Sequence, residues 1–428
     1  MPGHDEVASP KRVFILGAGL SAECGAPLIS NFLSEPFISL ISPEIRSIII
    51  EFLQTVEKEG IENIEEVLGL IDINIVRGSS IGPYQPSELH QIRRIVLEAI
   101  NEILTRIWDE INEELGVDKI DNPYAVQLSE IGQSEEIHRT KIIRMLVSEM
   151  ESFSLSSERN NTIEGKLPAR AEGWIKSYIS LIGILKPNDT IITFNYDNFL
   201  ELALSNILER QDIDLGFDYL ELSPDMDVLC HGDLFYRIRT PDFVKYKITV
   251  LRPHGSLNWG VCSNCGKLIV TYLTPLLGVK KYIEFIRDSA SEEEKERHFC
   301  CKNFDPQLLI VEPTWMKLYT NKYLGQIVEN AIHKLYEADE LYFIGYSFSE
   351  SDTLIREILT NSLHKRAGTT WDDIIVVNTS QEAIVRYKEF FRSLVIHQKR
   401  ASDFLKEMPR YEGFWRDPPK IVGRDHKI

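Results

Sequence analysis

The feature that most constrains the fold is a set of short apolar runs, each bounded by glycine, asparagine or proline. The first, Arg12 to Leu16, leads directly into a glycine turn. Strands that are apolar along their whole length are typical of a parallel sheet covered on both faces, and alternation with helices is the pattern of an α/β domain. The sequence therefore predicts an α/β fold with a parallel sheet. Its later strands are expected at Thr190 to Phe194, Ile248 to Leu251, Leu341 to Ile344 and Ile374 to Val377.

A long helical stretch interrupts this pattern after the first strand and its glycine turn. Its longest helix is expected to begin at Ser87, because apolar residues recur every three or four positions from Leu89 to Ile111, and Gly116 is expected to end it. Further amphipathic segments run from Glu135 to Met150 and from Trp174 to Leu185. We therefore expect a helical insertion over 36–185. The helices beside the later strands are expected at Lys322 to Tyr336, Glu350 to Leu363 and Gln381 to Phe391.

Composition limits the partners and the compartment of the chain. Its 428 residues carry a formal net charge of -18 and contain no run of lysine or arginine, so direct binding to nucleic acid is not expected. No segment approaches the ~18 consecutive apolar residues of a membrane span. The N-terminus lacks the basic start and apolar run of a signal peptide. We therefore expect a cytoplasmic protein that does not contact membranes.

The glycine turn Gly17-Ala18-Gly19 is a candidate phosphate site. Glycines after a strand allow the backbone to approach a pyrophosphate, and the N-terminus of the following helix stabilises its charge. The spacing differs from G-x-G-x-x-G, since the next glycine is Gly25. This difference disfavours a standard dehydrogenase, and a turn without a ligand is the alternative.

Candidate catalytic groups follow the second and third strands. Asn195 can hold a ribose hydroxyl or a water molecule and Asp197 can orient it, or both residues only end the strand and cap the next helix. His254 is a candidate general base, because the pKa range of histidine suits that work, and the glycine after it is expected to leave one ring face open to a ligand. His231, which is also followed by glycine, is the competing histidine.

Four of the six cysteines form a candidate metal site. Cys262 and Cys265 are spaced C-x-x-C, and Cys300 and Cys301 follow. Two thiolate pairs can complete a tetrahedral zinc site, and in a reducing compartment this pattern favours a metal over disulfides. Because adjacent cysteines seldom both reach one metal, His298 with Cys301 is the alternative second pair. The cysteines predict a small zinc-ribbon-like module over 261–304.

The order of these motifs resembles that of the sirtuins from Val13 to about Ser380. Two further turns after apolar strands, Gly345-Tyr346-Ser347 and Asn378-Thr379-Ser380, complete that order. The resemblance implies a Rossmann-like NAD-binding domain, interrupted by the helical insertion and the cysteine module, with NAD as substrate and a structural zinc ion. The NAD-binding domain would comprise 1–35, 186–260 and 305–428.

The resemblance also implies a role for each motif. Asn195 and His254 would be the catalytic residues, with His254 as the base; it is favoured over His231 because it lies immediately before the first cysteine pair. The residues implied in NAD binding are Gly17, Ala18, Gly19 and Ser21 at the phosphates, Asp197 with Asn195 at the nicotinamide ribose, Gly345 and Ser347 on the phosphate side, and Asn378 at the adenine ribose.

The departures from the sirtuin pattern concern its acyl-peptide parts. The arginine that deacylase sirtuins carry after the first motif is missing, and T-Q-N-I-D is replaced by T-F-N-Y-D. The segment 311–315 stands in place of a Phe-Gly-Glu turn. The chain therefore resembles the divergent prokaryotic sirtuin-like proteins of antiviral defence, which hydrolyse NAD outright. The segment Asn63 to Ile71 is also similar to one found in that branch.

The expected activity is NAD glycohydrolysis to nicotinamide and ADP-ribose by the effector of a bacterial antiphage defence system, with cyclised ADP-ribose as an open product. The alternatives are an NAD-dependent protein deacylase, a non-catalytic NAD or ADP-ribose sensor, and a scaffold that uses its helical insertion. Because constant NAD loss is toxic, we expect activity to be gated. Homo-oligomerisation, or assembly with a separately encoded ATPase or nucleic-acid-sensing protein, would provide the gate.

Overall fold

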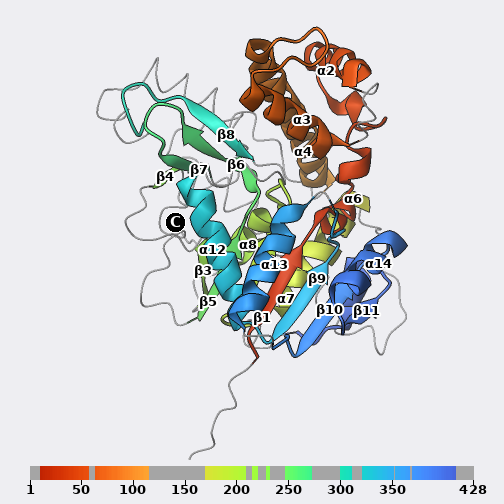
Figure 1. Ribbon diagram of the computed structural model, residues 1–428. Helices are drawn as coiled ribbons and strands as arrows, with labels where there is room; N and C mark the ends of the chain where they lie inside the picture. The colour runs from red at the N-terminus through yellow and green to blue at the C-terminus, as the bar shows by residue number, and fades with distance from the viewer. Residues whose placement is uncertain are drawn as a thin grey trace, which may run out of the picture.

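The computed structural model of the protein has a seven-stranded parallel sheet at its centre (Figure 1). The structure describes residues 10–56, 63–114, 169–208, 215–219, 228–231, 246–271, 299–310, 321–350, 352–366 and 369–410. The strands are β1 (Arg12–Leu16), β2 (Thr190–Thr193), β3 (Leu215–Tyr219), β5 (Tyr246–Leu251), β9 (Glu340–Ile344), β10 (Asp373–Val377) and β11 (Val395–His397). Their order is β11-β10-β9-β1-β2-β5-β3. The α/β parallel sheet expected from the sequence is confirmed.

The strands that the sequence predicted are the inner ones. β1 is buried at every residue, and the apolar runs at β2, β5, β9 and β10 coincide with the observed strands to within two residues. The two edge strands, β3 and β11, were not predicted. β11 has only three residues and is partly exposed, and β3 contains Gly216 and Asp218, so neither has a continuous apolar run.

The order of the strands places a crevice at the carboxyl ends of β1 and β9. From β1 the chain continues to its neighbour β2 on one side, and from β9 it continues to β10 on the other side. The boundary between β1 and β9 is therefore a topological switch point, the place where open α/β sheets bind ligands. The turns after these two strands touch through their backbones, since the Gly19 amide donates to the Gly345 carbonyl at 2.8 Å. Gly345 has φ +63°, and a Cβ there would lie 2.5 Å from the Leu20 nitrogen. A glycine is therefore required at this crossing.

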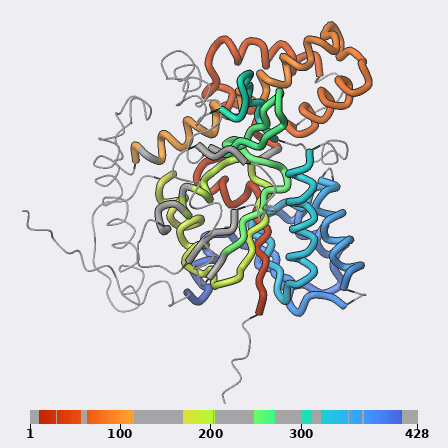
Figure 2. Tube along the Cα trace, turned by 90° about the vertical axis from the view of Figure 1, so that its left-hand side faces the viewer, coloured from red at the N-terminus to blue at the C-terminus, as the bar shows by residue number. Residues whose placement is uncertain are grey.

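Helices cover both faces of the sheet (Figures 1 and 2). On one face lie α12 (Lys322–Glu337) and α13 (Thr353–Lys365), close to the expected ranges. On the other face a continuous helical segment contains α6 (Ala169–Trp174), the π-helical turn η4 (Ile175–Ile179) and α7 (Ser180–Ile184). The segment η4 packs against α1 (Ala18–Ala22), α8 (Phe199–Leu208) and α15 (Ala401–Glu407). The helix α14 (Gln381–Phe390) also lies beside the sheet, close to its expected range (Figure 1).

Three helices of the predicted insertion stand above the carboxyl ends of the strands (Figure 1). They are α2 (Pro43–Val56), α3 (Ile64–Arg77) and α4 (Pro86–Glu114), joined to the glycine turn through the short turns η1 (Ile29–Asn31) and η2 (Ile38–Leu40). α4 matches the long helix expected from Ser87, whereas the segment expected from Glu135 to Met150 lies outside the described residues. Among the described helices, none is both long and apolar enough to cross a bilayer.

A second, four-stranded sheet carries the cysteines. Its order is β4-β7-β6-β8, formed by β4 (Val228–His231), β7 (Leu268–Thr271), β6 (Gly255–Cys262) and β8 (Pro306–Ile310). This sheet therefore extends beyond the predicted cysteine module over 261–304, since β4 precedes that range and β8 follows it. Gly255 starts β6 with φ +75°, and a Cβ there would lie 2.1 Å from the Leu309 carbonyl oxygen. The glycine thus serves the close pairing of β6 with β8, directly after His254.

Candidate active site

Asn195 lies just beyond β2, beside the glycine turn that follows β1. Its Nδ2 donates to Ser21 Oγ at 2.9 Å and to the Gly17 carbonyl oxygen at 3.2 Å. The side chain is buried, with 6% of its surface exposed. The first two sequence motifs therefore meet at one edge of the sheet, as expected for the carboxyl ends of neighbouring parallel strands.

Asp197 completes this polar cluster. Ser21 Oγ donates to Asp197 Oδ2 at 2.7 Å, while Oδ1 accepts from the Phe199 amide at 3.1 Å. The capping role considered for Asp197 is therefore present in addition to its contact with the glycine motif. Burial raises the pKa of Asp197, and the hydrogen bond from Ser21 and the charge of Arg252 partly offset this rise.

Tyr178 belongs to the same cluster and was not predicted. Its hydroxyl lies 2.7 Å from Ser21 Oγ and accepts from Asn195 Nδ2 at 3.4 Å. Burial raises the pKa of Tyr178 well above its usual value, so the phenol stays neutral. The residue comes from the π-helical turn η4, a local widening that is frequent at functional sites. In the sequence, Tyr178 is only one of the apolar residues on the buried face of a helix, so nothing marks it as a site residue.

Arg252 hydrogen-bonds the backbone of Asn195. Its Nη1 donates to the Asn195 carbonyl oxygen at 2.7 Å, and its Nε and Nη2 form a two-pronged ion pair with Glu201 at 2.5 Å. Arg252 has no exposed surface. A buried pair of this geometry fixes orientation more than it adds stability. The link therefore ties the Asn195 turn to the strand end that carries His254.

His254 lies in a second buried group at the same edge. Its Nε2 is 3.6 Å from Asp352 Oδ1, and only 1% of the residue is exposed. The Phe194 ring meets the imidazole edge-on at 4.9 Å between centroids, and the Tyr196 ring stacks at 6.3 Å. The expectation of an open ring face is wrong in this structure, because these two aromatic residues close around the histidine. They occupy the two positions at which T-F-N-Y-D departs from T-Q-N-I-D.

Asp352, the carboxylate partner of His254, was also not predicted. It caps α13, and its Oδ2 accepts a hydrogen bond from the Tyr346 hydroxyl. Burial acts to raise the pKa of Asp352, but the charge of His254 and hydrogen bonds from His254 and Tyr346 lower it below its usual value. A carboxylate held ionised beside an imidazole fixes the orientation of the ring. The sequence feature that could have indicated this role is an aspartate at a helix N-cap position shortly after the Gly345 turn.

The other predicted binding residues line the same edge. Asn378 Nδ2 donates to the Tyr346 carbonyl oxygen at 2.8 Å, which ties the turn after β10 to the turn after β9. The Ser347 carbonyl oxygen accepts from Arg386 Nη2 at 2.9 Å. Gly345 crosses the glycine turn, as described above. His231, by contrast, lies on β4 of the second sheet.

The four predicted cysteines gather at one point. All four Sγ atoms lie within 4.8 Å of one another, with Cys262 Sγ 3.6 Å from Cys301 Sγ and Cys265 Sγ 3.3 Å from Cys300 Sγ. A disulfide requires about 2.05 Å. Tetrahedral zinc with bonds of about 2.3 Å separates its sulfur ligands by about 3.8 Å. The adjacent cysteines both face the cluster, and the donor set fits zinc; His298 lies outside the described residues.

Replacing Cys265 by serine is expected to remove zinc from the protein. Because a tetrahedral thiolate site needs all four ligands, zinc content should fall from about one ion per chain to a small fraction, and the melting temperature should fall with it. Mass spectrometry of the metal content checks this. Ser263→Ala is the matched control, since Ser263 lies in the same turn and bonds Asp305 instead. Full zinc occupancy in Cys265→Ser would contradict the assignment.

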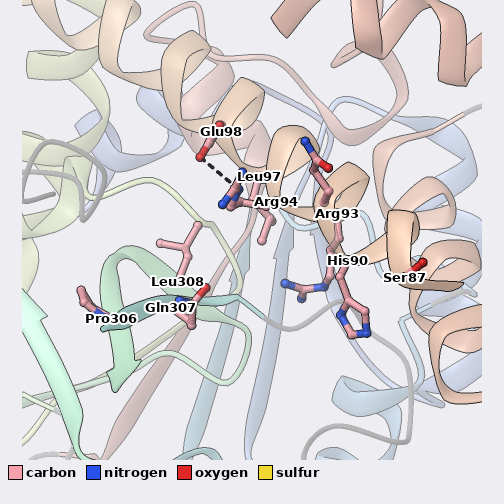
Figure 3. Close-up of a pocket in the computed structure, with 10 residues that line it drawn as sticks. Ser87, His90, Arg93, Arg94, Leu97, Glu98, Pro306, Gln307 and Leu308 are labelled. Atoms are coloured by element: carbon pink, nitrogen blue, oxygen red, sulfur yellow. Dashed lines mark ion pairs between the residues drawn. The ribbon is translucent and has the colours of Figure 1, made fainter. Parts of the chain in front are cut away.

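A cavity of about 540 Å³ lies apart from these residues, between α4 and β8 (Figure 3). Arg93 lies at this boundary and pairs with Asp72 of α3 at 2.9 Å, while its Nη2 donates to the Ile310 carbonyl oxygen at 3.3 Å. Arg94 and Glu98 form an ion pair at 3.8 Å on its helical wall. The cavity therefore marks where the helical insertion meets the second sheet.

Topology and site together define a Rossmann-like α/β protein with a switch-point crevice and a four-cysteine module. No family model matches the chain, and no curated protein matches it.

Among solved structures the chain is similar to a Sir2 homolog–NAD complex, with 13% identity over 94% of this chain and 89% of that one, at a TM-score of 0.35. It is similar to a complex of Sir2 with a p53 peptide and NAD+, with 12% identity over 92% and 90%, at a TM-score of 0.32. A structure of a Sir2 enzyme, described for its mechanism and regulation, gives 13% identity over 95% and 93%, at 0.33.

Proposed function

We propose that the chain binds NAD and hydrolyses its nicotinamide–ribose bond. The observation that carries this proposal is the meeting of two buried polar groups at one sheet edge. One group joins Asn195, Ser21 and Asp197, and the other pairs His254 with Asp352. Both lie at the carboxyl ends of parallel strands, beside the switch point between β1 and β9, where a dinucleotide binds in open α/β sheets.

The glycine turns at the switch point would accept the pyrophosphate. Gly17 and Gly19 follow β1, and Gly345 follows β9, so no Cβ stands between the two crossing backbones. Glycine turns between a strand and a helix bind the pyrophosphate in dinucleotide-binding folds, where the start of the following helix favours its charge. Ser347 and Asn378, on the turns after β9 and β10, would contact the remainder of the adenosine side.

The polar groups would then act on the nicotinamide ribose. The bond from C1′ to the nicotinamide nitrogen breaks, and nicotinamide leaves as a neutral amide. Asn195 holds the attacking water, whose oxygen bonds to C1′, and His254 accepts the proton that this water loses before passing it to solvent. The balance is one NAD+ and one water consumed, and one nicotinamide, one ADP-ribose and one proton produced.

The surroundings of His254 support hydrolysis over acyl transfer. A deacylase must bring an acyl-lysine next to the ribose, beside the histidine. Here Phe194 and Tyr196 contact the imidazole, and the ring is almost fully buried. We therefore favour water as the acceptor. The biological role proposed with it is the cytoplasmic effector of a bacterial antiphage system that depletes NAD, gated by self-assembly or by a separately encoded ATPase or nucleic-acid-sensing partner.

The test is incubation of the purified full chain with NAD, alone and with the protein encoded beside its gene, followed by mass identification of the products. Nicotinamide and ADP-ribose in equal amounts are expected. A requirement for an acetylated peptide would instead indicate the deacylase, and cyclised ADP-ribose would identify a cyclase. Tight NAD binding without any product, in both samples, would indicate a sensor and overturn the proposal.

A further inference from the structure

The hydroxyl of Tyr178 completes the hydrogen bonds around Ser21. Ser21 Oγ carries one hydrogen, which it donates to Asp197 Oδ2 at 2.7 Å. The same oxygen accepts from Asn195 Nδ2 at 2.9 Å and lies 2.7 Å from the Tyr178 hydroxyl. Because the serine hydrogen is already committed to the carboxylate, the phenol is the donor in this last contact. A hydroxyl has one donor and two acceptor positions, so every position of Ser21 Oγ is used.

This network determines which way the Asn195 amide faces. Its Nδ2 lies beside three oxygens that can accept, namely Ser21 Oγ at 2.9 Å, the Gly17 carbonyl at 3.2 Å and the Tyr178 hydroxyl at 3.4 Å. An amide turned by half a rotation would place its own oxygen against the Gly17 carbonyl oxygen, and two acceptors repel. Asn195 Oδ1 therefore faces away from the cluster. Among the described residues, no hydrogen bond is made to this oxygen, which can accept two.

Tyr178 reaches the cluster because its helical segment approaches the glycine turn closely. A Cβ on Gly173 would overlap the Glu23 carbonyl oxygen, so this approach requires a glycine in α6. The Tyr178 ring meets the Phe199 ring edge-on at 6.2 Å between centroids, and Trp174 Nε1 donates to the Phe199 carbonyl oxygen at 3.3 Å. These contacts fix the ring, and the widened turn η4 carries it. The position of the phenol oxygen is therefore set by the helical segment.

We propose that Tyr178 is a positioning residue for Asn195: its hydroxyl holds Ser21 and the Asn195 amide in the orientation that presents Asn195 Oδ1 to the attacking water. This inference rests on the proposed function. The water would donate one hydrogen to Oδ1 and the other to His254, which leaves a lone pair on its oxygen for C1′ of NAD. Without the phenol, the Ser21 oxygen loses one of its two donors, and the amide is held less firmly.

The first test compares Tyr178→Phe with Tyr342→Phe. The control also removes one hydroxyl from a buried tyrosine, since Tyr342 on β9 donates to Glu340 at 2.8 Å. In Tyr178→Phe we expect kcat for nicotinamide release to fall about tenfold or more, with KM for NAD within about twofold of the wild type, because the position of the reacting water is disturbed and the contacts to the adenosine side are not. Tyr342→Phe should keep the wild-type kcat. Equal effects of the two substitutions would assign the phenol to folding alone and overturn the proposal.

A double-mutant cycle tests the route through Ser21. Ser21→Ala breaks the same link from the other side, so it should lower kcat at least as much as Tyr178→Phe does. Adding Tyr178→Phe to Ser21→Ala should then cost little more, because two residues that act through one network are not additive. Full additivity would mean that Tyr178 does not act on Asn195 through Ser21, and it would contradict the proposal.

A second measurement does not require turnover. NMR of the full chain with isotope-labelled asparagine follows exchange of the Asn195 amide hydrogens with solvent, and the signal is assigned from its loss in Asn195→Ala. Because the phenol holds the acceptor of this amide, Tyr178→Phe should speed the exchange about tenfold or more, and Tyr342→Phe should leave it unchanged. If Tyr178→Phe does not fold, as thermal unfolding would report, Ser21→Ala takes its place.

The two measurements separate failure of this inference from failure of the proposed function. Faster exchange in Tyr178→Phe, from a wild type that cleaves no NAD, would mean that only the proposed function fails. Unchanged exchange in the folded variant would overturn the role of Tyr178, whatever its kcat. Faster exchange with an unchanged kcat, in an enzyme that does cleave NAD, would also overturn it, because the orientation of the amide would then not matter to the reaction.

Discussion

Asn195→Ala is expected to reduce NAD hydrolysis by about 10²–10³-fold or more, because a positioned polar group at the reacting centre contributes on that scale. The side-chain amide nitrogen of Asn195 donates to Ser21, to the Gly17 carbonyl and to the Tyr178 hydroxyl, and the backbone carbonyl oxygen of Asn195 accepts from Arg252. The orientation of the side chain is thus set before substrate arrives. Rates of nicotinamide release at saturating NAD, measured for the variant and the wild type, check the prediction.

The same substitution leaves polar partners in the buried cluster without the Asn195 amide. It should lower the free energy of unfolding by about 1–3 kcal/mol, the usual cost of an unsatisfied buried group. Thermal unfolding and NAD binding are therefore measured beside the rate. Asn303→Ala is the control, since Asn303 is exposed and lies in the four-cysteine module. Wild-type turnover in a folded Asn195→Ala protein would contradict the assignment of Asn195 as a catalytic residue.

The inner sheet could be predicted from the sequence because its strands are buried on both faces. Phe14 and Ile15 of β1 have no exposed surface, and Ile191 and Val376 are equally buried in their strands. Such strands have one composition along their whole length. The second sheet gave no comparable signal, since buried polar residues such as Ser256 and Asn258 interrupt β6. Only the cysteines indicated a module in that part of the chain.

The polar cluster around Asn195 was accessible to the same reasoning. Residues that follow neighbouring parallel strands meet at one edge, so the glycine turn, Asn195 and Asp197 were expected to lie together. Tyr178 and Asp352 were not predicted, because each enters the site from a helix or the start of one rather than from a strand end. Helical periodicity predicts which residues face inward, but it does not predict what they meet there.

The structure gives the helical insertion a role that the sequence did not indicate. In the sequence it is an interruption that suggests an interaction module. In the structure, η4 brings Tyr178 to Asn195, and Arg93 of α4 donates to the Ile310 carbonyl of β8. Under the proposed function, gating by assembly would have a physical route, because a partner that moves η4 would also move Tyr178, which contacts Asn195.

His254→Ala is expected to lower kcat by about 10²–10⁴-fold, the range that a positioned general base contributes. KM for NAD should change little, because the phosphates and the adenosine are held by other turns. The pH dependence should change too: the acidic limb of the wild-type profile, which reports protonation of the base, should be absent from the variant. His333→Ala is the matched control, since His333 is an exposed histidine on α12, where it faces Glu337.

Removing His254 should also change how stability depends on pH. The histidine is the main reason that the pKa of Asp352 lies below its usual value, whereas burial acts in the opposite direction. Without the imidazole, burial dominates, and the Asp352 carboxyl then favours folding only while it is protonated. His254→Ala should therefore raise the pKa of the Asp352 carboxyl, and its thermal unfolding should depend on pH between 5 and 8 differently from that of the wild type. An identical pH dependence would mean that His254 and Asp352 do not act as a pair, and unchanged kcat would remove His254 from the reaction.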